Sequence, residues 1–350
     1  MAIDWTAPMQ QVLAYYEVDP VTWRDIRQID TVVSCTVTRD SSTPTLESAR
    51  FAIDGEPMGE GWVRCYLDAT QDGQEERVPV GTWIVQTPIR KLDGRVEELS
   101  AIAYSVLHPL REAMPPVGFS LPTGADCAEQ AASCLEHGPA PVQGCNGGTK
   151  LSEPYVAPIS ASWLDVACTL AASAGLTVGF DGTGTIHLTP STPASALLPT
   201  WSFRDDESSI LLPEASDSDD WYGMPNVCTV VCGHMVGRAV NDDPGSAVST
   251  VSRGREVELR VTDPKELKEG CTQEEVDLAA RMRLQEASCM ERAVVISHGF
   301  CPVGLGNCID LDYRAMRLAG NAVVTRQVVE LSTGVKIDTT AALKQQMWSA

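Results

Sequence analysis

The sequence predicts a mainly β protein with α/β insertions, in which two antiparallel β-barrel domains flank a small helix-hairpin domain. Three observations lead to this fold class: a series of short alternating segments before residue 108, a helix followed by a hairpin near the middle, and a second β-rich series after residue 226. The chain of 350 residues is long enough for two or three domains with their own cores. Its 43% hydrophobic and 21% charged residues are ordinary for a folded globular protein.

The first β-rich unit follows an aromatic segment, VLAYYEVDPVTWRDIRQI at residues 12–29, which we interpret as an extended arm. From Thr31 the stretch TVVSCTVTRDSS alternates, so that Val33, Cys35 and Val37 share one face of a half-buried strand. The segments SARFAIDG, WVRCYLDAT, VGTWIVQTPIR and VEELSAIAYSVL follow, separated by Asp-Gly turn signals. Roughly five strands in about eighty residues favour an antiparallel barrel or sandwich.

The middle of the chain predicts a small α/β domain. PPVGFSLPTG at residues 115–124 reads as a linker, and ADCAEQAASCLEH has the composition and periodicity of a short helix. Ser160 or Ser162 can cap a second helix, Gly175 ends it, and Asp181-Gly182 turns a hairpin. The inner face of this second helix carries Trp163, Val166, Ala167 and Leu170.

The last third of the chain predicts a second β-rich unit interrupted by one helix. Residues 204–220, RDDESSILLPEASDSDD, are acidic and indicate a loop, after which NVCTVVCG and SRGREVELRVTD resume the β pattern. Thr272 and Glu275 form a capping box for a helix whose apolar stripe carries Val276, Ala280 and Leu284. AVVISHGF, NCIDLDY and NAVVTRQVVEL follow, so we expect the helix to be an insertion into a second barrel.

We place domain boundaries where the composition changes, as at His108-Pro109. The predicted units are an N-terminal arm at 1–27, a first β-barrel at 28–110, a small α/β domain at 111–200, an acidic linker at 201–221, a second β-barrel at 222–340 with a helical insertion at about 272–288, and a C-terminal tail at 341–350.

The net charge of −21 argues against stable binding to nucleic acid, because a grip on phosphates depends on Lys and Arg. No apolar run approaches the roughly 18 residues that a membrane-spanning helix needs. The start, MAIDWTAPMQQ, has neither the basic nor the apolar region of a signal peptide, so we expect synthesis in the cytosol and no membrane anchor.

The twelve cysteines are too few for a disulfide scaffold, and most are expected to be small buried hydrophobes. Four of them lie in predicted strands: Cys35, Cys228, Cys232 and Cys308. Cys228 and Cys232 would share a strand face about 13 Å apart, too far for a direct disulfide.

One cluster offers the ligand types of a zinc site, namely Cys127, Cys134, His137 and Cys145. Its C-x6-C-x2-H-x7-C spacing differs from the usual paired knuckles, so buried or free thiols are the favoured interpretation. Metal binding is the minor alternative. A third interpretation is a disulfide from Cys127 or Cys134 to Cys145 that forms after release from the cell. We rank it below buried or free thiols and above metal binding.

The sequence carries no catalytic or nucleotide-binding fingerprint. Its five histidines form no H-E-x-x-H or H-x-E pattern, and there is neither a G-x-S-x-G elbow nor a G-x-x-x-x-G-K-[ST] loop. The acidic clusters at 205–207 and 217–220 lack the glycine-turned spacing of a calcium loop. Glu97 and Glu98 would point to opposite faces of a strand and could not act as an acid-base pair. We therefore predict no enzyme, and assign no catalytic, cofactor-binding or metal-binding residue and no cofactor.

The order of these segments resembles the tail or baseplate hub proteins of tailed bacteriophages, whose relatives include the hub part of type VI secretion spikes. The resemblance rests on DPVTW, SCTVTRDSS, VPVGTWIV, SWLDVACTLAASAGLTVGFDGTGTIHL, MPNVCTVVCG and PVGLGNCIDLDY, which occur in that order over nearly the whole chain. It implies a structural protein of the virion tail tip, assembled in the host cytoplasm.

The resemblance implies a homotrimer with two tube-like barrels per subunit, which adapts a sixfold tail tube to a threefold tip and lines the DNA exit channel. Pro79-Val80-Gly81 and Pro302-Val303-Gly304 would then start matching strands in the two barrels. The implied partners are tail tube protein, distal tail protein, tape measure protein and a separate tip spike or fibre protein. An acidic lumen would let DNA pass without specific binding.

The main alternative is a β-rich carbohydrate-binding or receptor-binding module of a phage or bacterial surface. Tryptophans could supply its sugar-stacking faces, and the candidates are Trp23, Trp62, Trp83, Trp163, Trp201 and Trp221. Because they are scattered over every segment, we favour a role for them in cores and interfaces.

Overall fold

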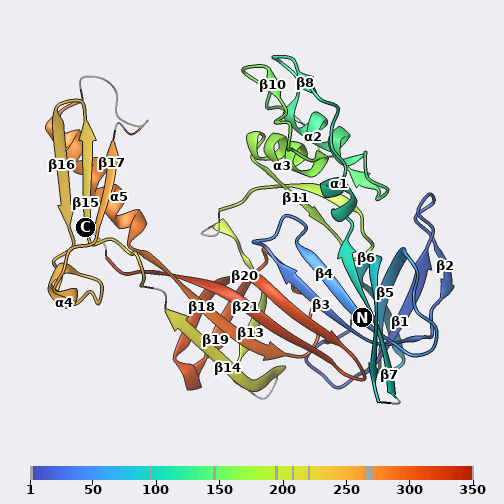
Figure 1. The fold of residues 1–350 in the computed structure, drawn as a ribbon. Coiled ribbons are helices and arrows are strands. Elements are labelled where there is room, and N and C mark those ends of the chain that lie inside the picture. Colours follow the sequence, from blue (N-terminus) through green and yellow to red (C-terminus); the bar gives the residue numbers. More distant parts are fainter. Residues whose placement is uncertain are drawn as a thin grey trace.

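A computed structural model describes residues 3–94, 96–144, 147–193, 196–206, 209–219, 221–262, 264 and 271–348. Within these residues the chain is mainly β with five α-helices, so the predicted fold class is confirmed at this level. Figure 1 shows a large sheet at the bottom of the view, with a green lobe and an orange lobe standing above it. None of the described helices combines the length and the apolar character needed to cross a membrane.

The largest sheet has thirteen strands in two halves. The first half contains β1 (Gln10–Val18), β2 (Asp25–Gln28), β3 (Val32–Asp40), β4 (Glu47–Ile53), β5 (Gly61–Gln71), β6 (Gln74–Asp93) and β7 (Val96–Ser105). The second half contains β13 (Pro199–Arg204), β14 (Leu211–Asp219), β18 (Cys289–His298), β19 (Cys308–Tyr313), β20 (Leu318–Leu331) and β21 (Val335–Gln346). The order is β14-β18-β21-β20-β3-β4-β7-β6-β5-β1-β2, and β19 joins β13 to β20.

Strands β20 and β3 join the two halves. They pair antiparallel, from Arg326 opposite Asp40 to Leu331 opposite Cys35. The first part of β20 pairs with β19 instead, so this long strand belongs to both ladders. The hydrophobic core of the first half also takes in four buried residues from the second half, namely Phe300, Val329, Leu331 and Ile337. The halves therefore share a core as well as a ladder.

The large sheet is open. Among the described strands, β2 pairs only with β1, β14 only with β18 and β13 only with β19, so each of the three has a free edge. Neither half closes into a barrel on its own within this chain. The two-barrel architecture therefore stays a prediction.

The green lobe is an α/β module made of α1 (His108–Glu112), β8 (Ser120–Leu121), α2 (Cys127–Leu135), β9 (Val142–Gln143), β10 (Tyr155–Val156), α3 (Trp163–Ser173), β11 (Leu176–Phe180) and β12 (Ile186–Pro190). Ser162, not Ser160, caps α3 and forms a capping box with Asp165. Gly175 follows the helix with φ of +69°, a conformation that favours glycine. The predicted helix and hairpin are thus α3 and β11–β12.

The orange lobe contains β15 (Val227–Cys232), β16 (Met235–Val240), α4 (Thr250–Arg253), β17 (Glu258–Thr262) and α5 (Gln273–Ala287). Its strands form a separate sheet in the order β16-β15-β17. The predicted Thr272–Glu275 capping box is present, and Val276, Ala280 and Leu284 are buried against this sheet. The helix covers a small sheet of its own, so the segment inserted between β14 and β18 includes β15, β16 and β17 as well as α5. The barrel expected around this insertion stays a prediction.

Several segments expected outside sheets form strands, and residues 341–346 of the predicted C-terminal tail belong to β21. Part of the N-terminal segment, interpreted as an extended arm, forms β1 and β2, and β1 pairs with β5 along its whole length. The acidic stretch interpreted as a loop contains β14, which pairs with β18. The polar residues of β14 are compatible with a strand because it lies at a sheet edge and most of its side chains are exposed.

The two Pro-Val-Gly segments do not start matching strands, which corrects the sequence prediction. Pro79 and Gly81 lie inside β6, opposite Tyr66 and Cys65, and Val80 is the extra residue of a bulge between them. A bulge accommodates Pro79, which lacks a backbone N–H. The second segment, at 302–304, lies in the loop between β18 and β19.

Candidate assembly surfaces

Three of the four residues of the zinc hypothesis, Cys127, Cys134 and His137, lie in or beside the core of the α/β module. Cys127 and Cys134 are buried on α2, and burial raises the pKa of Cys134 to about 11. His137 stacks on Trp163 with ring centroids 3.8 Å apart and planes 12° apart. Cys145 lies outside the described residues. Across the described chain, no group of three or more His, Cys, Asp or Glu side chains is arranged to hold a metal ion.

The acidic candidates are dispersed. Asp217 pairs with Arg292 across β14 and β18, and Glu98 pairs with Lys91 at 3.3 Å across the β6–β7 hairpin. Glu207, Asp220 and the side chain of Glu97 lie outside the described residues. Asp217 and Glu98 are thus each paired with a cation of their own.

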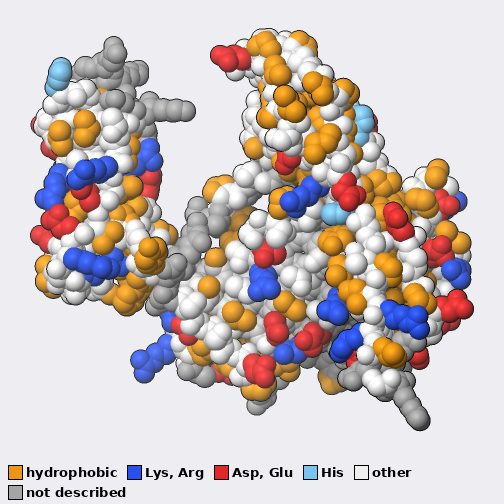
Figure 2. Space-filling model, viewed as in Figure 1, with side chains coloured by type: hydrophobic (Ala, Val, Ile, Leu, Met, Phe, Trp, Pro, Cys, Tyr) orange, Lys and Arg blue, Asp and Glu red, His pale blue; other side chains and the backbone are white. Residues whose placement is uncertain are grey.

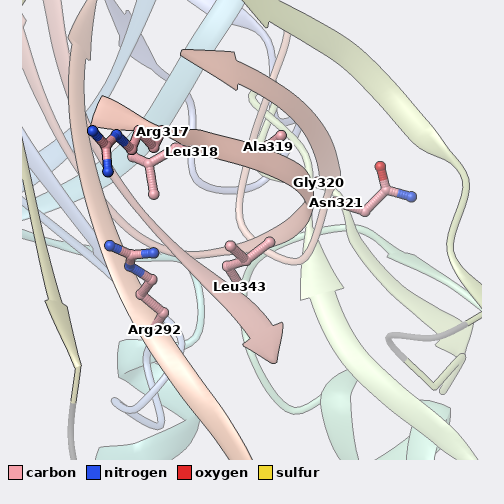
Figure 3. A pocket seen from close by; sticks show the side chains of 7 residues that line it. All are labelled: Arg292, Arg317, Leu318, Ala319, Gly320, Asn321 and Leu343. Atoms are coloured by element: carbon pink, nitrogen blue, oxygen red, sulfur yellow. The ribbon is translucent and has the colours of Figure 1, made fainter. Parts of the chain in front are cut away.

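A pocket of about 670 Å³ lies where β18, β20 and β21 run side by side. Figure 3 shows the guanidinium groups of Arg292 and Arg317 on the same side of it. Leu318, Ala319, Gly320, Asn321 and Leu343 complete the described lining, which offers neither a carboxylate nor a nucleophile. Arg292 is already paired with Asp217 on β14, so part of the positive charge at this pocket is neutralised within the chain.

A polar network crosses the junction of the halves, beginning at Glu47 on β4. Trp83 Nε1 donates to Glu47 Oε1, and Arg39 Nε donates to Glu47 Oε2 at 2.7 Å. Arg39 also donates from Nη2 to the Val80 carbonyl at 2.7 Å and from Nη1 to Gln327 Oε1 at 3.3 Å. Glu47 is only 6% exposed, so Arg39 neutralises a carboxylate that water hardly reaches.

The network continues into the second half. Gln327 Nε2 donates to the Val303 carbonyl and to Thr339 Oγ1, each at 3.1 Å. His298 Nδ1 lies 2.6 Å from the Gly299 carbonyl, and His298 Nε2 lies 2.8 Å from Thr339 Oγ1. Because a carbonyl only accepts, we assign the proton to Nδ1, and Nε2 then accepts from the Thr339 hydroxyl. Burial lowers the pKa of His298 to about 4, which keeps the ring neutral at pH 7.

A second set of contacts fixes the α/β module to the large sheet. The turn between β11 and β12 presents its backbone carbonyls to three side chains. Arg64 Nη2 and Trp23 Nε1 both donate to the Thr183 carbonyl at 2.9 Å, and Thr82 Oγ1 donates to the Gly182 carbonyl at 3.0 Å. The sequence shows the Asp181-Gly182 turn but not its acceptor role, because the donors lie about 100 residues or more away.

The free edges and one projecting hairpin are open to contact with other chains. All four residues of β2 are exposed, with Ile26 at 56%. The β6–β7 hairpin exposes residues on both faces beyond Gln86, among them Leu92 at 70%. Unpaired backbone groups at a sheet edge are a template for pairing with another strand. These features are exposed and offer unpaired backbone groups, which makes them candidates for contact with another chain.

An apolar patch covers the outer end of the α/β module. Val117, Val156 and Ile159 are 89%, 62% and 87% exposed. β8 and β10 pair there, with Val156 opposite Ser120. Figure 2 shows hydrophobic side chains gathered over this lobe. Exposed apolar side chains grouped in this way are typical of protein contact sites.

No protein-family model and no curated protein sequence matches the chain. Solved structures do match it along almost its whole length. The 43 kDa tail protein of prophage MuSo2 from Shewanella oneidensis superimposes with a TM-score of 0.63 over 95% of this chain and 98% of that chain, at 11% identity. A tail protein from Neisseria meningitidis MC58 gives 0.59 over 95% and 97%, at 13% identity.

A chain of the Francisella PdpA–VgrG complex is similar as well, with a TM-score of 0.57 and 5% identity. The match covers 96% of this chain but 53% of the Francisella chain, so the present chain corresponds to about half of it. The chain therefore has the fold of a phage tail or baseplate hub-like protein, and the resemblance found in the sequence is confirmed at the level of fold.

Proposed function

We propose that this chain is a structural hub of a phage tail tip or baseplate. The observation that carries the proposal is the match in fold of 95% of the chain to two tail proteins. The open thirteen-stranded sheet supports a role in assembly, because its free edges leave backbone groups for neighbouring subunits. The protein then acts by shape and contact, with no reaction of its own.

The hub is proposed to be a homotrimer. A head-to-tail contact that joins a free edge of one subunit, such as β2, to a free edge of the next, such as β14, closes into a ring when the rotation is threefold. Each subunit contributes two half-sheets, so three subunits present six. Barrel closure, which neither half achieves alone, would come from these neighbours. Such a ring adapts a sixfold tube to a threefold tip.

The ring is proposed to surround the DNA exit channel. The charge of −21 disfavours adhesion of DNA to the wall by like-charge repulsion, so the genome passes without specific binding. The proposed neighbours are tail tube protein, distal tail protein, tape measure protein and a separate spike or fibre. The exposed apolar end of the α/β module is the surface that we assign to contacts with them.

The carbohydrate-binding alternative is less well supported. Trp62, Trp83 and Trp163 are at most 7% exposed and pack in hydrophobic cores. Trp23 donates its indole N–H to the Thr183 carbonyl and packs against Trp62. Indoles used in this way are not available as stacking platforms for sugars.

The proposal is tested by the mass of the purified, reduced chain in solution, measured by light scattering and native mass spectrometry with and without tube protein. A trimer, or a ring that forms when tube protein is added, is expected. Ile26→Lys on β2 should weaken assembly by introducing a charge at the edge, whereas Val21→Lys, 90% exposed in the adjacent turn, should not. A chain that stays monomeric and inert beside tail proteins would overturn the proposal.

A further inference from the structure

Two thiols of the orange lobe lie together although 39 residues separate them in the sequence. Cys271 Sγ is 3.2 Å from Cys232 Sγ. Cys232 is the last residue of β15, and Cys271 immediately precedes Thr272, the N-cap of α5. A disulfide bond measures about 2.05 Å, so the two sulfur atoms must approach by only about 1.2 Å to form one.

Both sulfur atoms are carried by well-defined elements. β15 is the central strand of its sheet and pairs with β16 and β17. The start of α5 is held by the capping box of Thr272 and Glu275 and by Val276, which is fully buried. Gly237 on β16 allows this close packing, because a Cβ there would lie 2.5 Å from the Val276 carbonyl oxygen. The helix start and the central strand therefore hold the two cysteines close to each other in the folded chain.

The two thiols differ in access. Cys271 is 9% exposed, whereas Cys232 is half-buried at the end of its strand. An oxidant from solution therefore reaches Cys232 first, and Cys271 is placed to react second. Cys228, on the same strand as Cys232, is fully buried in the core beneath α5 and is not accessible to the same reagent.

We propose that Cys232 and Cys271 form an oxidation-sensitive dithiol site, which a small disulfide such as glutathione disulfide converts into an intramolecular disulfide. The Cys232 thiolate attacks one sulfur of the oxidant, forms a mixed disulfide and releases one glutathione thiolate. The Cys271 thiolate then attacks Cys232 Sγ and releases the second glutathione. The two protein thiols lose two electrons and two protons in total, and the oxidant is reduced to two thiols.

The new bond ties the start of α5 to the end of β15. It restricts the unfolded chain between Cys232 and Cys271, so the equilibrium constant for unfolding of this lobe is expected to fall, on the order of 100-fold. A lobe assembled with thiols in a reducing cell would thereby become covalently locked in an oxidising medium. This inference does not depend on the proposed trimer.

The test uses the whole wild-type chain, fully reduced and then incubated with glutathione disulfide. After alkylation and proteolysis, mass spectrometry should find a cross-linked peptide that contains Cys232 and Cys271, and the intact chain should carry the corresponding loss of two hydrogen atoms. Cys271→Ser should instead trap a glutathione mixed disulfide at Cys232. Cys168→Ser, which removes an exposed thiol on α3, should leave the cross-link unchanged.

Recovery of Cys232 and Cys271 from the oxidised wild-type chain as separate alkylated thiols, or as two mixed disulfides, would overturn the proposal. The exposed Cys168 serves as the internal standard, since its conversion to a mixed disulfide shows that the oxidant was effective. Circular dichroism before and after oxidation establishes that the chain stays folded. Because the decisive result comes from wild-type protein, it does not depend on whether a variant folds.

Discussion

The carbonyl oxygens of Val80 and Val303 accept hydrogen bonds from two side chains that face each other across the junction of the half-sheets. Arg39 donates to Val80 at 2.7 Å and Gln327 donates to Val303 at 3.1 Å. Arg39 and Gln327 are direct partners in the β3–β20 ladder. Both Pro-Val-Gly segments therefore contribute a backbone carbonyl to the same polar network, one from each half, although neither segment starts a strand.

Replacement of Arg39 by Leu should destabilise the protein by about 3–5 kcal/mol, because it leaves the buried Glu47 carboxylate without its cation. Urea denaturation followed by tryptophan fluorescence measures this loss. The matched control is Arg27→Leu, whose partner Glu17 is exposed and whose ion pair is worth less than about 1 kcal/mol. Equal losses for the two variants would contradict the assigned role of the junction.

The stability of the chain should depend on the buried His298. Its pKa is lowered by burial from an ordinary 6.5 to about 4, so between these values the unfolded chain binds the proton and the folded chain does not. Protonation of the unfolded chain therefore lowers the free energy of unfolding as the pH falls from about 6.5 to about 4, by roughly 3 kcal/mol in all. Above about pH 6.5 this loss is absent.

The pH effect is isolated by comparing wild type with His298→Gln in denaturant titrations at pH 7.5, 5.5 and 4.5. The difference in their free energies of unfolding should change over this range, because only wild type carries the imidazole. His234→Gln, at an exposed site, should follow wild type at every pH. A difference between wild type and His298→Gln that does not vary with pH would refute the prediction.

Gly182→Ala should loosen the contact between the α/β module and the large sheet. A Cβ at this position would lie 2.0 Å from the Pro79 carbonyl oxygen, so the turn must move away from its donors on the sheet. We expect a loss of about 1–3 kcal/mol and faster hydrogen exchange in β11 and β12. Gly59→Ala, where a Cβ meets no atom within 4 Å, is the control and should leave both measurements unchanged.

Tyr15→Phe should leave stability unchanged or raise it by up to about 1 kcal/mol. The buried Tyr15 hydroxyl has no hydrogen bond to a described nitrogen or oxygen, and its partner is the weakly bonding Cys65 thiol. Burial raises the pKa of Tyr15 far above the ordinary value. Tyr66→Phe provides the contrast, since it removes a 2.9 Å hydrogen bond to Asp25 and should destabilise by about 0.5–1.5 kcal/mol. Thermal unfolding of both variants decides the point, and a marked loss of stability in Tyr15→Phe would contradict it.

The local elements were largely predictable because their signals lie within a few residues. Ser162 and Thr272 cap helices through side chains that reach the backbone three residues ahead. The stripe of Val276, Ala280 and Leu284 follows from the helical period and is buried as expected. The β14 strand was missed because its polar composition, which suits an exposed edge, is also that of a loop.

The sequence by itself determined the mainly β class, the two capped helices and the tail-hub resemblance, since composition, period and order along the chain are all local or sequential properties. The tertiary structure alone decided which strands pair and which side chains meet. Three contacts illustrate this, because each joins residues from different parts of the chain: the β3–β20 ladder, the His137–Trp163 stack and the Cys232–Cys271 contact. An alternating pattern tells which face of a strand is buried, but it carries no information about which other strand will occupy its edge.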